Sequence, residues 1–216
     1  DGRMRWTLGS MGPGTKLPSL GHTTYDHLKK TFALQAKGLI LGGADAFMVE
    51  TSQDLLQTKA AINGCRVAMV ETDTRLPLFV EVTVETTGTM LMGSEINAAL
   101  TALEPLGIDM IGLNCATGPQ EMSEHLRQLS QHAEIPVMVM PNAGLPVLTA
   151  TGASYPLSPE DLATAHEQFV KEFGLSLVGG CCGTTPEHLG AVVKRLGGTA
   201  PKLRTPIPEH GVASLY

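Results

Sequence analysis

The sequence has few aromatic and few charged residues, and it shows no excess of positive charge. Of its 216 residues, 4% are aromatic and 17% are charged, and the formal net charge is −6. Proteins that bind nucleic acid carry a basic surface, so we expect no nucleic-acid partner. No apolar run reaches the roughly 18 residues needed to cross a bilayer, so we also expect no membrane partner. With 43% hydrophobic residues, the chain can bury the core of one domain.

Cysteine is also scarce, and no pair of histidines has the spacing of a helical zinc site. Four cysteines in a glycine-rich chain do not resemble the disulfide framework of a small secreted protein. We therefore expect a cytoplasmic protein whose cysteines serve as ligands or nucleophiles. The histidines are scattered, and six of them are predicted to lie on the surface: His22, His125, His132, His166, His188 and His210.

Short apolar runs alternate with longer helical patterns along the whole chain. Strands are predicted at 5–9, 46–50, 78–83, 109–113, 136–140 and 176–178, and helices at 24–41, 53–70, 95–106, 120–132, 159–174 and 186–195. Polar residues follow nearly every strand, as they do in the loops of a barrel. A doubly wound sheet would also accommodate six strands, but we favour an α/β fold, a (β/α)₈ TIM barrel lacking its first two βα units.

The last segment differs from the rest in composition. Residues 198–216 contain three prolines and no helical period, which is typical of an extended linker. We therefore expect residues 1–197 to form units three to eight of the barrel, and residues 198–216 to lead toward another domain.

Three cysteines follow predicted strands. Cys115 comes after the fourth strand, and Cys181 and Cys182 lie in the glycine-rich turn after the sixth. Because the carboxyl ends of parallel strands face one rim of a barrel, the three thiols can converge there. Three thiolates would suit a catalytic zinc ion, which keeps one position open. A phosphate-binding turn, a redox pair and simple packing remain alternatives, and Cys65, inside a helical pattern, is predicted to be a packing residue.

Other polar residues at strand ends are candidates for binding the rest of a substrate. Glu50 can pair with an ammonium group, and Asn142 can bind a polar group or reach a metal. Ser10 and the Gly-Pro-Gly loop after it can bind a carboxylate. Each of these side chains can instead satisfy nearby backbone groups. Glu81 lies within the third predicted strand, where we expect a structural hydrogen bond.

Several of these motifs resemble the homocysteine S-methyltransferase family. They are Gly112-Leu113-Asn114-Cys115, the run from Met140 to Pro146, and Gly179-Gly180-Cys181-Cys182-Gly183-Thr184-Thr185-Pro186. Residues 8–13 and 49–51 agree in order, and the resemblance covers about residues 4–197. It is strongest to the homocysteine-binding module of the cobalamin-dependent members. The family's first-strand motif, Asp-Gly-Ala-Met-Gly-Thr, and the second unit after it are not found here, which implies a barrel without those units.

The resemblance implies a methyltransferase with zinc bound by Cys115, Cys181 and Cys182. Homocysteine would add its thiolate to the zinc and attack the methyl group of methylcobalamin, which another domain would bind, and methionine would form. Glu50 matches a glutamate near the homocysteine amino group, and Asn142 an asparagine beside the metal. The tail resembles the linker to a folate-binding domain. Alternatives are a methyltransferase that uses S-methylmethionine or betaine, and a non-catalytic zinc- or phosphate-binding barrel.

Overall fold

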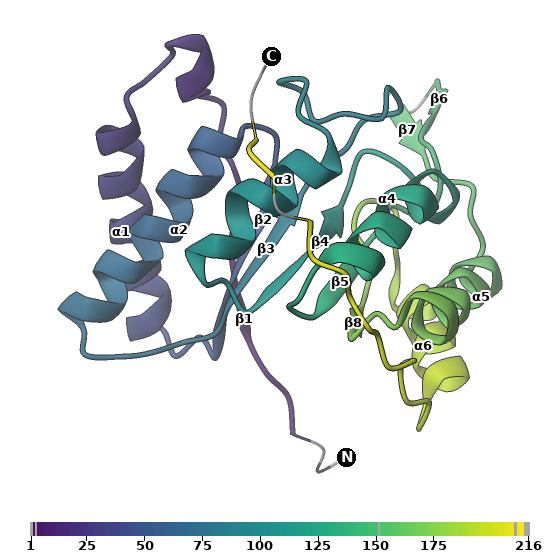
Figure 1. Ribbon diagram of the computed structural model, residues 1–216. Helices are drawn as coiled ribbons and strands as arrows, with labels where there is room; N and C mark the ends of the chain where they lie inside the picture. The colour runs from purple at the N-terminus through teal and green to yellow at the C-terminus, as the bar shows by residue number, and fades with distance from the viewer. Residues whose placement is uncertain (1, 3, 151, 210, 214–216) are drawn as a thin grey trace.

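The core of the protein is one curved parallel sheet. The computed structural model describes residues 2, 4–150, 152–209 and 211–213. Its six strands pair in chain order, and all of the pairs are parallel. The strands are β1 (Leu8–Met11), β2 (Ala46–Ser52), β3 (Leu78–Val82), β4 (Met110–Asn114), β5 (Val137–Met140) and β8 (Leu177–Val178). Figure 1 shows the helices around the outside of this sheet, in the arrangement of a barrel wall.

A helix follows each strand of the sheet. The helices are α1 (Tyr25–Leu41), α2 (Leu55–Glu71), α3 (Ile96–Leu103), α4 (Pro119–His132), α5 (Pro159–Gln168) and α6 (Pro186–Leu196). Short 3₁₀ turns lie at Pro18–Leu20 and Glu104–Leu106, and a π-helical turn at Phe169–Phe173 extends α5. The Ser158 hydroxyl accepts from the backbone of Asp161 at the start of α5, which is the cap expected from the Ser-Pro sequence. The six predicted βα units are confirmed.

The two faces of the sheet have different roles. Phe47 and Val49 of β2 belong to the large apolar core that the strands share with the helices. Successive side chains in a strand point to opposite faces, so Met48 and Glu50 point to the inner side of the curved sheet. The same alternation places Asn114 of β4 on the inner side. The polar residues at the strand ends are therefore brought toward one another by the curvature of the sheet.

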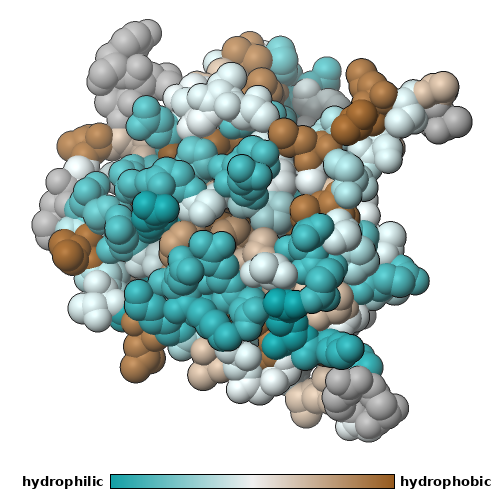
Figure 2. Space-filling model, turned by 90° about the vertical axis from the view of Figure 1, so that its right-hand side faces the viewer, coloured by the Kyte–Doolittle hydropathy of each residue, from teal (hydrophilic) through white to brown (hydrophobic). Residues whose placement is uncertain are grey.

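The long loop predicted after the fifth strand contains a small hairpin. Strands β6 (Val147–Thr149) and β7 (Gly152–Ser154) pair antiparallel and do not join the main sheet. None of the helices in the part of the chain that the structure describes is both long and apolar enough to cross a membrane. Figure 2 shows the side that carries α5, which is largely hydrophilic with scattered apolar residues.

The segment after α6 has no helix or strand in its described residues, as predicted, but it is bound to the barrel. The backbone N–H of Lys202 donates to the carbonyl of Val170 at 3.0 Å, and that of Ile207 donates to the carbonyl of Gln131 at 2.8 Å. Figure 1 shows this segment, in yellow, crossing the outside of the helices. Residues 210 and 214–216 of the predicted linker, and residues 1, 3 and 151 of the predicted barrel, lie outside the described residues.

Candidate metal centre

The three cysteines predicted to converge lie together at the carboxyl ends of β4 and β8. Their sulfur atoms are all within 4.8 Å of one another. The Sγ of Cys182 is 3.7 Å from that of Cys115 and 3.9 Å from that of Cys181. Cys115 and Cys181 are half-buried, and Cys182 is exposed. A small molecule can therefore reach the cluster from solvent.

Backbone hydrogen bonds hold the loops of the cluster together. The N–H of Cys115 donates to Met140 at the end of β5, and the N–H of Cys181 donates to Pro141 just beyond it. Cys115 has a φ of 61°, a left-handed conformation that costs free energy in a residue other than glycine. Such strain persists where the surrounding contacts fix the backbone. The thiols are thus placed by the architecture and not by their own flexibility.

The spacing and ionisation of the thiols both fit a zinc ion. Sulfur atoms bound to one tetrahedral zinc at about 2.3 Å lie about 3.8 Å apart, close to the two distances above. A hydrogen bond from the Cys181 thiol lowers the pKa of Cys115 to about 6. The same bond, together with burial, raises the pKa of Cys181 well above the ordinary value of a thiol. One thiolate thus disfavours the next, and a dication is what would allow all three to ionise.

Asn142 supports the cluster from the loop after β5. Its side chain is 2% exposed, and its Oδ1 accepts a hydrogen bond of 3.0 Å from the backbone N–H of Cys182. Its side chain is also within hydrogen-bonding reach of Cys115 and helps to lower the pKa of that thiol. The sequence analysis named this residue as a contact for a polar substrate group or a metal, and the structure places it beside the thiols of Cys115 and Cys182.

Glu50 and Ser10, predicted as separate substrate contacts, lie side by side. The Ser10 hydroxyl donates a hydrogen bond of 2.5 Å to Oε1 of Glu50. Ser10 is exposed, so this end of the site is open. An anionic substrate group near Ser10 and a cationic one near Glu50 would both find a partner there.

Asn114 joins the two halves of the site, and the sequence analysis gave it no role. It is 1% exposed, and its Nδ2 lies 3.4 Å from Oε2 of Glu50 and 3.9 Å from the Sγ of Cys181. Its position directly before Cys115 was visible in the sequence, but its contacts join positions more than 60 residues apart. Sequence reasoning without the fold therefore had no signal for them.

Two histidines predicted on the surface are buried, so that prediction was wrong. His166 is fully buried, and its Nε2 is 2.7 Å from the carbonyl of Gly179. Gly179 begins the turn that carries Cys181 and Cys182, which we call the cysteine turn. His188 is 8% exposed and its Nε2 is 2.9 Å from the carbonyl of Leu157. Each ring finds a backbone acceptor, which allows a polar side chain to be buried. Burial lowers the pKa of His166 to about 4, so this ring is neutral at pH 7.

Two other buried groups have different outcomes. Cys65 is fully buried with its Sγ 3.4 Å from the sulfur of Met11, and burial raises its pKa to about 12, so its packing role is confirmed.

Glu81 is also fully buried, but within the described structure neither of its carboxyl oxygens has a hydrogen-bond partner. The structural hydrogen bond expected there is absent. Burial, with a smaller effect of Glu50, raises the pKa of Glu81 well above its usual value.

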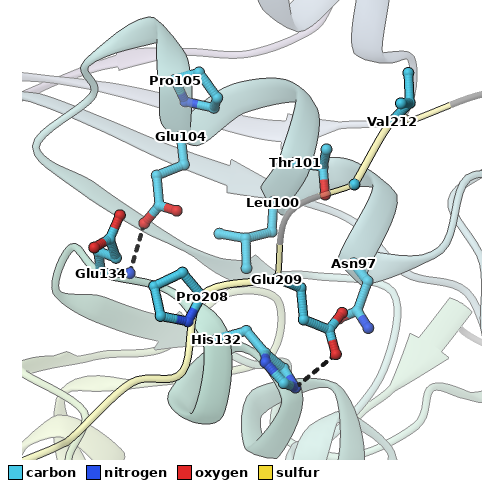
Figure 3. A pocket seen from close by; sticks show the side chains of 11 residues that line it. Asn97, Leu100, Thr101, Glu104, Pro105, His132, Glu134, Pro208, Glu209 and Val212 are labelled. Atoms are coloured by element: carbon cyan, nitrogen blue, oxygen red, sulfur yellow. Dashed lines mark hydrogen bonds and ion pairs between the residues drawn. The ribbon is translucent and has the colours of Figure 1, made fainter.

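A separate cavity of about 430 Å³ lies between α3, the end of α4 and the C-terminal segment. In Figure 3 the ring of His132 faces Glu209, and the two side chains are 3.6 Å apart. The backbone N–H of Glu134 donates to Glu104 across the same cavity at 2.7 Å. None of the predicted site residues lines this cavity. It is a product of the docking of the C-terminal segment and not part of the thiol site.

Comparison of the sequence with known proteins points to one family. The family model described as homocysteine S-methyltransferase matches residues 1–196. The methionine synthases of Mycobacterium leprae (strain TN) and Mycobacterium tuberculosis (strain ATCC 25618 / H37Rv) are each 63% identical to the chain, over 217 and 214 residues. These alignments cover 98% and 99% of this chain but 18% of each relative, so the chain spans less than a fifth of their length.

Solved structures with a similar fold include the homocysteine methyltransferase MmuM from Escherichia coli. Its apo form has a TM-score of 0.66 and 21% identity, and the match covers 87% of this chain and 61% of that one. Its metallated form has a TM-score of 0.64 and 20% identity, covering 81% of this chain and 53% of that one. At this level of identity the likeness concerns the fold, and it agrees with six units of a (β/α)₈ barrel.

Proposed function

Because this chain belongs to the homocysteine S-methyltransferase family, we propose that it binds homocysteine and presents its thiolate for methylation by methylcobalamin, giving methionine. The single observation that carries this proposal is the cluster of three thiols, Cys115, Cys181 and Cys182, with sulfur spacings that suit one zinc ion. A site built from three thiolates leaves one position for a fourth ligand.

Zinc held by these three cysteines would favour the thiolate form of homocysteine and keep its sulfur electron-rich. The methyl donor would supply a methyl group whose old bonding pair stays with the donor. The thiol proton of homocysteine leaves to solvent, which reaches the site beside the exposed Cys182.

The remaining residues of the chain would orient the amino acid end of the substrate. Glu50 would pair with the ammonium group, and Ser10, with the loop after it, would bind the carboxylate. These two side chains already contact each other at 2.5 Å, so both substrate groups, which share one carbon atom, would find their partners in one place. Asn142 would hold the Cys182 loop through its bond to the Cys182 backbone.

The complete reaction needs more protein than this chain. Since the chain spans 18% of the length of two methionine synthases, we propose that other domains of the same polypeptide bind cobalamin and folate. Residues 1–197 would form the homocysteine-binding barrel, and residues 198–216 would lead to the folate-binding domain. A cytoplasmic location is in keeping with four free thiols.

A donor assay on the complete polypeptide tests this function. Zinc-loaded protein is mixed with homocysteine and either methylcobalamin, S-methylmethionine or betaine, and methionine is measured. We expect methionine from methylcobalamin only, and we expect Cys182→Ser to abolish it, while Cys65→Ala, which removes a thiol outside the cluster, retains it. Methionine from S-methylmethionine or betaine would establish the alternative donor. No methionine from any donor, with zinc still bound, would point to a non-catalytic metal site.

A further inference from the structure

We propose that Asn114 is a positioning residue that couples binding of the substrate ammonium group at Glu50 to the environment of the Cys181 sulfur. This inference rests on the proposed function. Asn114 ends β4, and its side chain contacts both the carboxyl group of Glu50 and the sulfur of Cys181. A change at one of these groups therefore alters what the amide can give to the other.

The amide of Asn114 has more acceptors than it can serve equally. Its Nδ2 carries two hydrogens and has three neighbours: the Thr51 hydroxyl at 2.8 Å, Glu50 Oε2 at 3.4 Å and Cys181 Sγ at 3.9 Å. The contact with Thr51 uses one hydrogen at a good distance. The other hydrogen is shared between Glu50 and Cys181, both at long distances. This shared hydrogen links the two halves of the site.

The other end of the amide fixes the backbone that carries Glu50. Oδ1 of Asn114 accepts a hydrogen bond of 2.8 Å from the N–H of Thr51. Thr51 has a φ of 56°, and the pairing of β2 with β3 changes register between Val49 and Ser52. Such a bulge redirects the side chain next to it, here Glu50. Asn114 thus pairs with the Thr51 N–H at the point where the regular pairing is interrupted.

Asn114 itself has little freedom to move. Its side chain is 1% exposed, and its own backbone carbonyl accepts a hydrogen bond of 3.0 Å from the Thr83 hydroxyl. A fixed amide can change its hydrogen bonds only through the groups around it. When an ammonium group pairs with Glu50, that carboxyl group competes less for the shared hydrogen of Nδ2, and the hydrogen bond from Nδ2 to Cys181 becomes stronger. A hydrogen bond to a sulfur ligand withdraws charge from it and leaves more room for charge on the substrate sulfur.

The test compares two thiol ligands in the complete, metal-loaded polypeptide. Homocysteine and 4-mercaptobutanoate differ only in the amino group. Calorimetry gives the affinity of each, and in the cobalt(II)-substituted protein the sulfur-to-cobalt absorption band reports on the cysteine ligands. The variants are Asn114→Ala and Asn114→Ser, of which the second keeps an oxygen that can accept from Thr51. Asn142→Ala is the matched control, because Asn142 also supports a cysteine of the cluster but contacts Cys182.

We expect the unmodified protein to bind homocysteine more tightly than 4-mercaptobutanoate. In both Asn114 variants the ratio of the two affinities should fall about tenfold, which corresponds to the loss of one hydrogen bond to a charged group. Asn142→Ala should weaken both ligands by the same factor. Equal weakening of both ligands in the Asn114 variants would overturn the inference and leave Asn114 a merely structural residue. If the unmodified protein bound neither thiol, the proposed function itself would fail.

One measurement needs no variant. The amino acid 2-aminobutanoate carries the ammonium and carboxylate groups without a thiol, so it can reach Glu50 but cannot bind the metal through sulfur. We expect it, at saturation, to shift the sulfur-to-cobalt band of the unmodified protein, because the shared amide hydrogen of Asn114 then bonds more strongly to Cys181. A band that stays in place while calorimetry shows binding would contradict the coupling. Absence of binding would count against ammonium recognition by Glu50, which belongs to the proposed function.

Discussion

Replacing Gly183 with alanine is expected to disturb the cysteine turn, whereas the same replacement at Gly190 is expected to be harmless. Gly183 has a φ of +77°, and a Cβ there would lie 2.6 Å from Cδ2 of Tyr155 and closer still to two other atoms of that side chain. The left-handed conformation costs an alanine about 1–2 kcal/mol and the overpacking about 1–3 kcal/mol, which together give about 2–5 kcal/mol. Gly190 lies in α6 with nothing within 4 Å of its Cβ position, and alanine there stabilises by about 0.5–1 kcal/mol.

Hydrogen exchange measured by mass spectrometry on the complete polypeptide separates the two variants. In Gly183→Ala, peptides covering residues 179–186 should lose about 30-fold or more in protection, the equivalent of about 2 kcal/mol. Transfer of the metal to a chelator should also become faster, because the displaced Tyr155 ring lies beside the turn that carries Cys182. Gly190→Ala should leave both observables unchanged or slightly more stable. If the two variants behaved alike, the account of the turn would be wrong.

Three further changes have defined outcomes. Burial lowers the pKa of His166 to about 4, below the unfolded value of about 6.5, so the stability that the neutral ring contributes is complete above pH 6.5 and is lost toward pH 4, at up to about 1.4 kcal/mol per pH unit. Hydrogen exchange of α5, measured at pH 7 and pH 5 and corrected for the intrinsic rate, should show this loss of stability. His166→Gln should remove the pH dependence. In metal-free protein at pH 7, iodoacetamide should label Cys115, with a pKa of about 6, well before Cys65, with a pKa of about 12. Added zinc should protect Cys115 from labelling. Earlier labelling of Cys65 would contradict the burial of that thiol. Asn142→Ala leaves the backbone N–H of Cys182 without its hydrogen-bond partner, at a cost of about 1–3 kcal/mol, so zinc should bind about 10- to 100-fold more weakly. Asn97→Ala, in the remote cavity of Figure 3, is the control variant and should keep full zinc affinity.

The βα units were predictable because each has a local signal. The apolar run at the predicted strand 46–50 became β2 (Ala46–Ser52), and the Ser-Pro start of the predicted helix 159–174 became the beginning of α5 (Pro159–Gln168). The convergence of the three cysteines followed from one geometric rule, that parallel strands end at the same rim. These predictions needed the order of the elements but no knowledge of individual contacts.

The features that were missed depend on contacts between distant residues. The backbone N–H of Thr51, a residue with a positive φ, donates to the side-chain amide of Asn114, which lies 63 positions away in the sequence. The ring of His166 can be buried because the backbone carbonyl of Gly179 is its hydrogen-bond partner. Every residue has a backbone carbonyl, so the sequence does not show which one will be this partner. Strands β6 (Val147–Thr149) and β7 (Gly152–Ser154) lie where the sequence predicts a loop, because each has only three residues. Local patterns therefore predict the framework of the site better than the bonds that tune it.

The C-terminal segment combines both situations. Its prolines correctly indicated that residues after α6 form no regular element in the described structure. They did not indicate that Arg204 would donate hydrogen bonds to the carbonyls of Ala133, at 2.9 Å, and of Ser130, at 3.3 Å. These acceptors lie at the end of α4, where carbonyl groups lack partners within the helix. A cation at this position binds the segment to the barrel.

The central claim is that Cys115, Cys181 and Cys182 hold a zinc ion that receives the homocysteine sulfur. The most direct test is X-ray absorption at the zinc edge, with elemental analysis, on the complete polypeptide before and after homocysteine is added. The account predicts one zinc per site, three sulfur neighbours at about 2.3 Å without substrate, and a fourth sulfur with it. A folded and reduced protein that binds no zinc, or a zinc ion whose sulfur count does not change with homocysteine, would contradict the account.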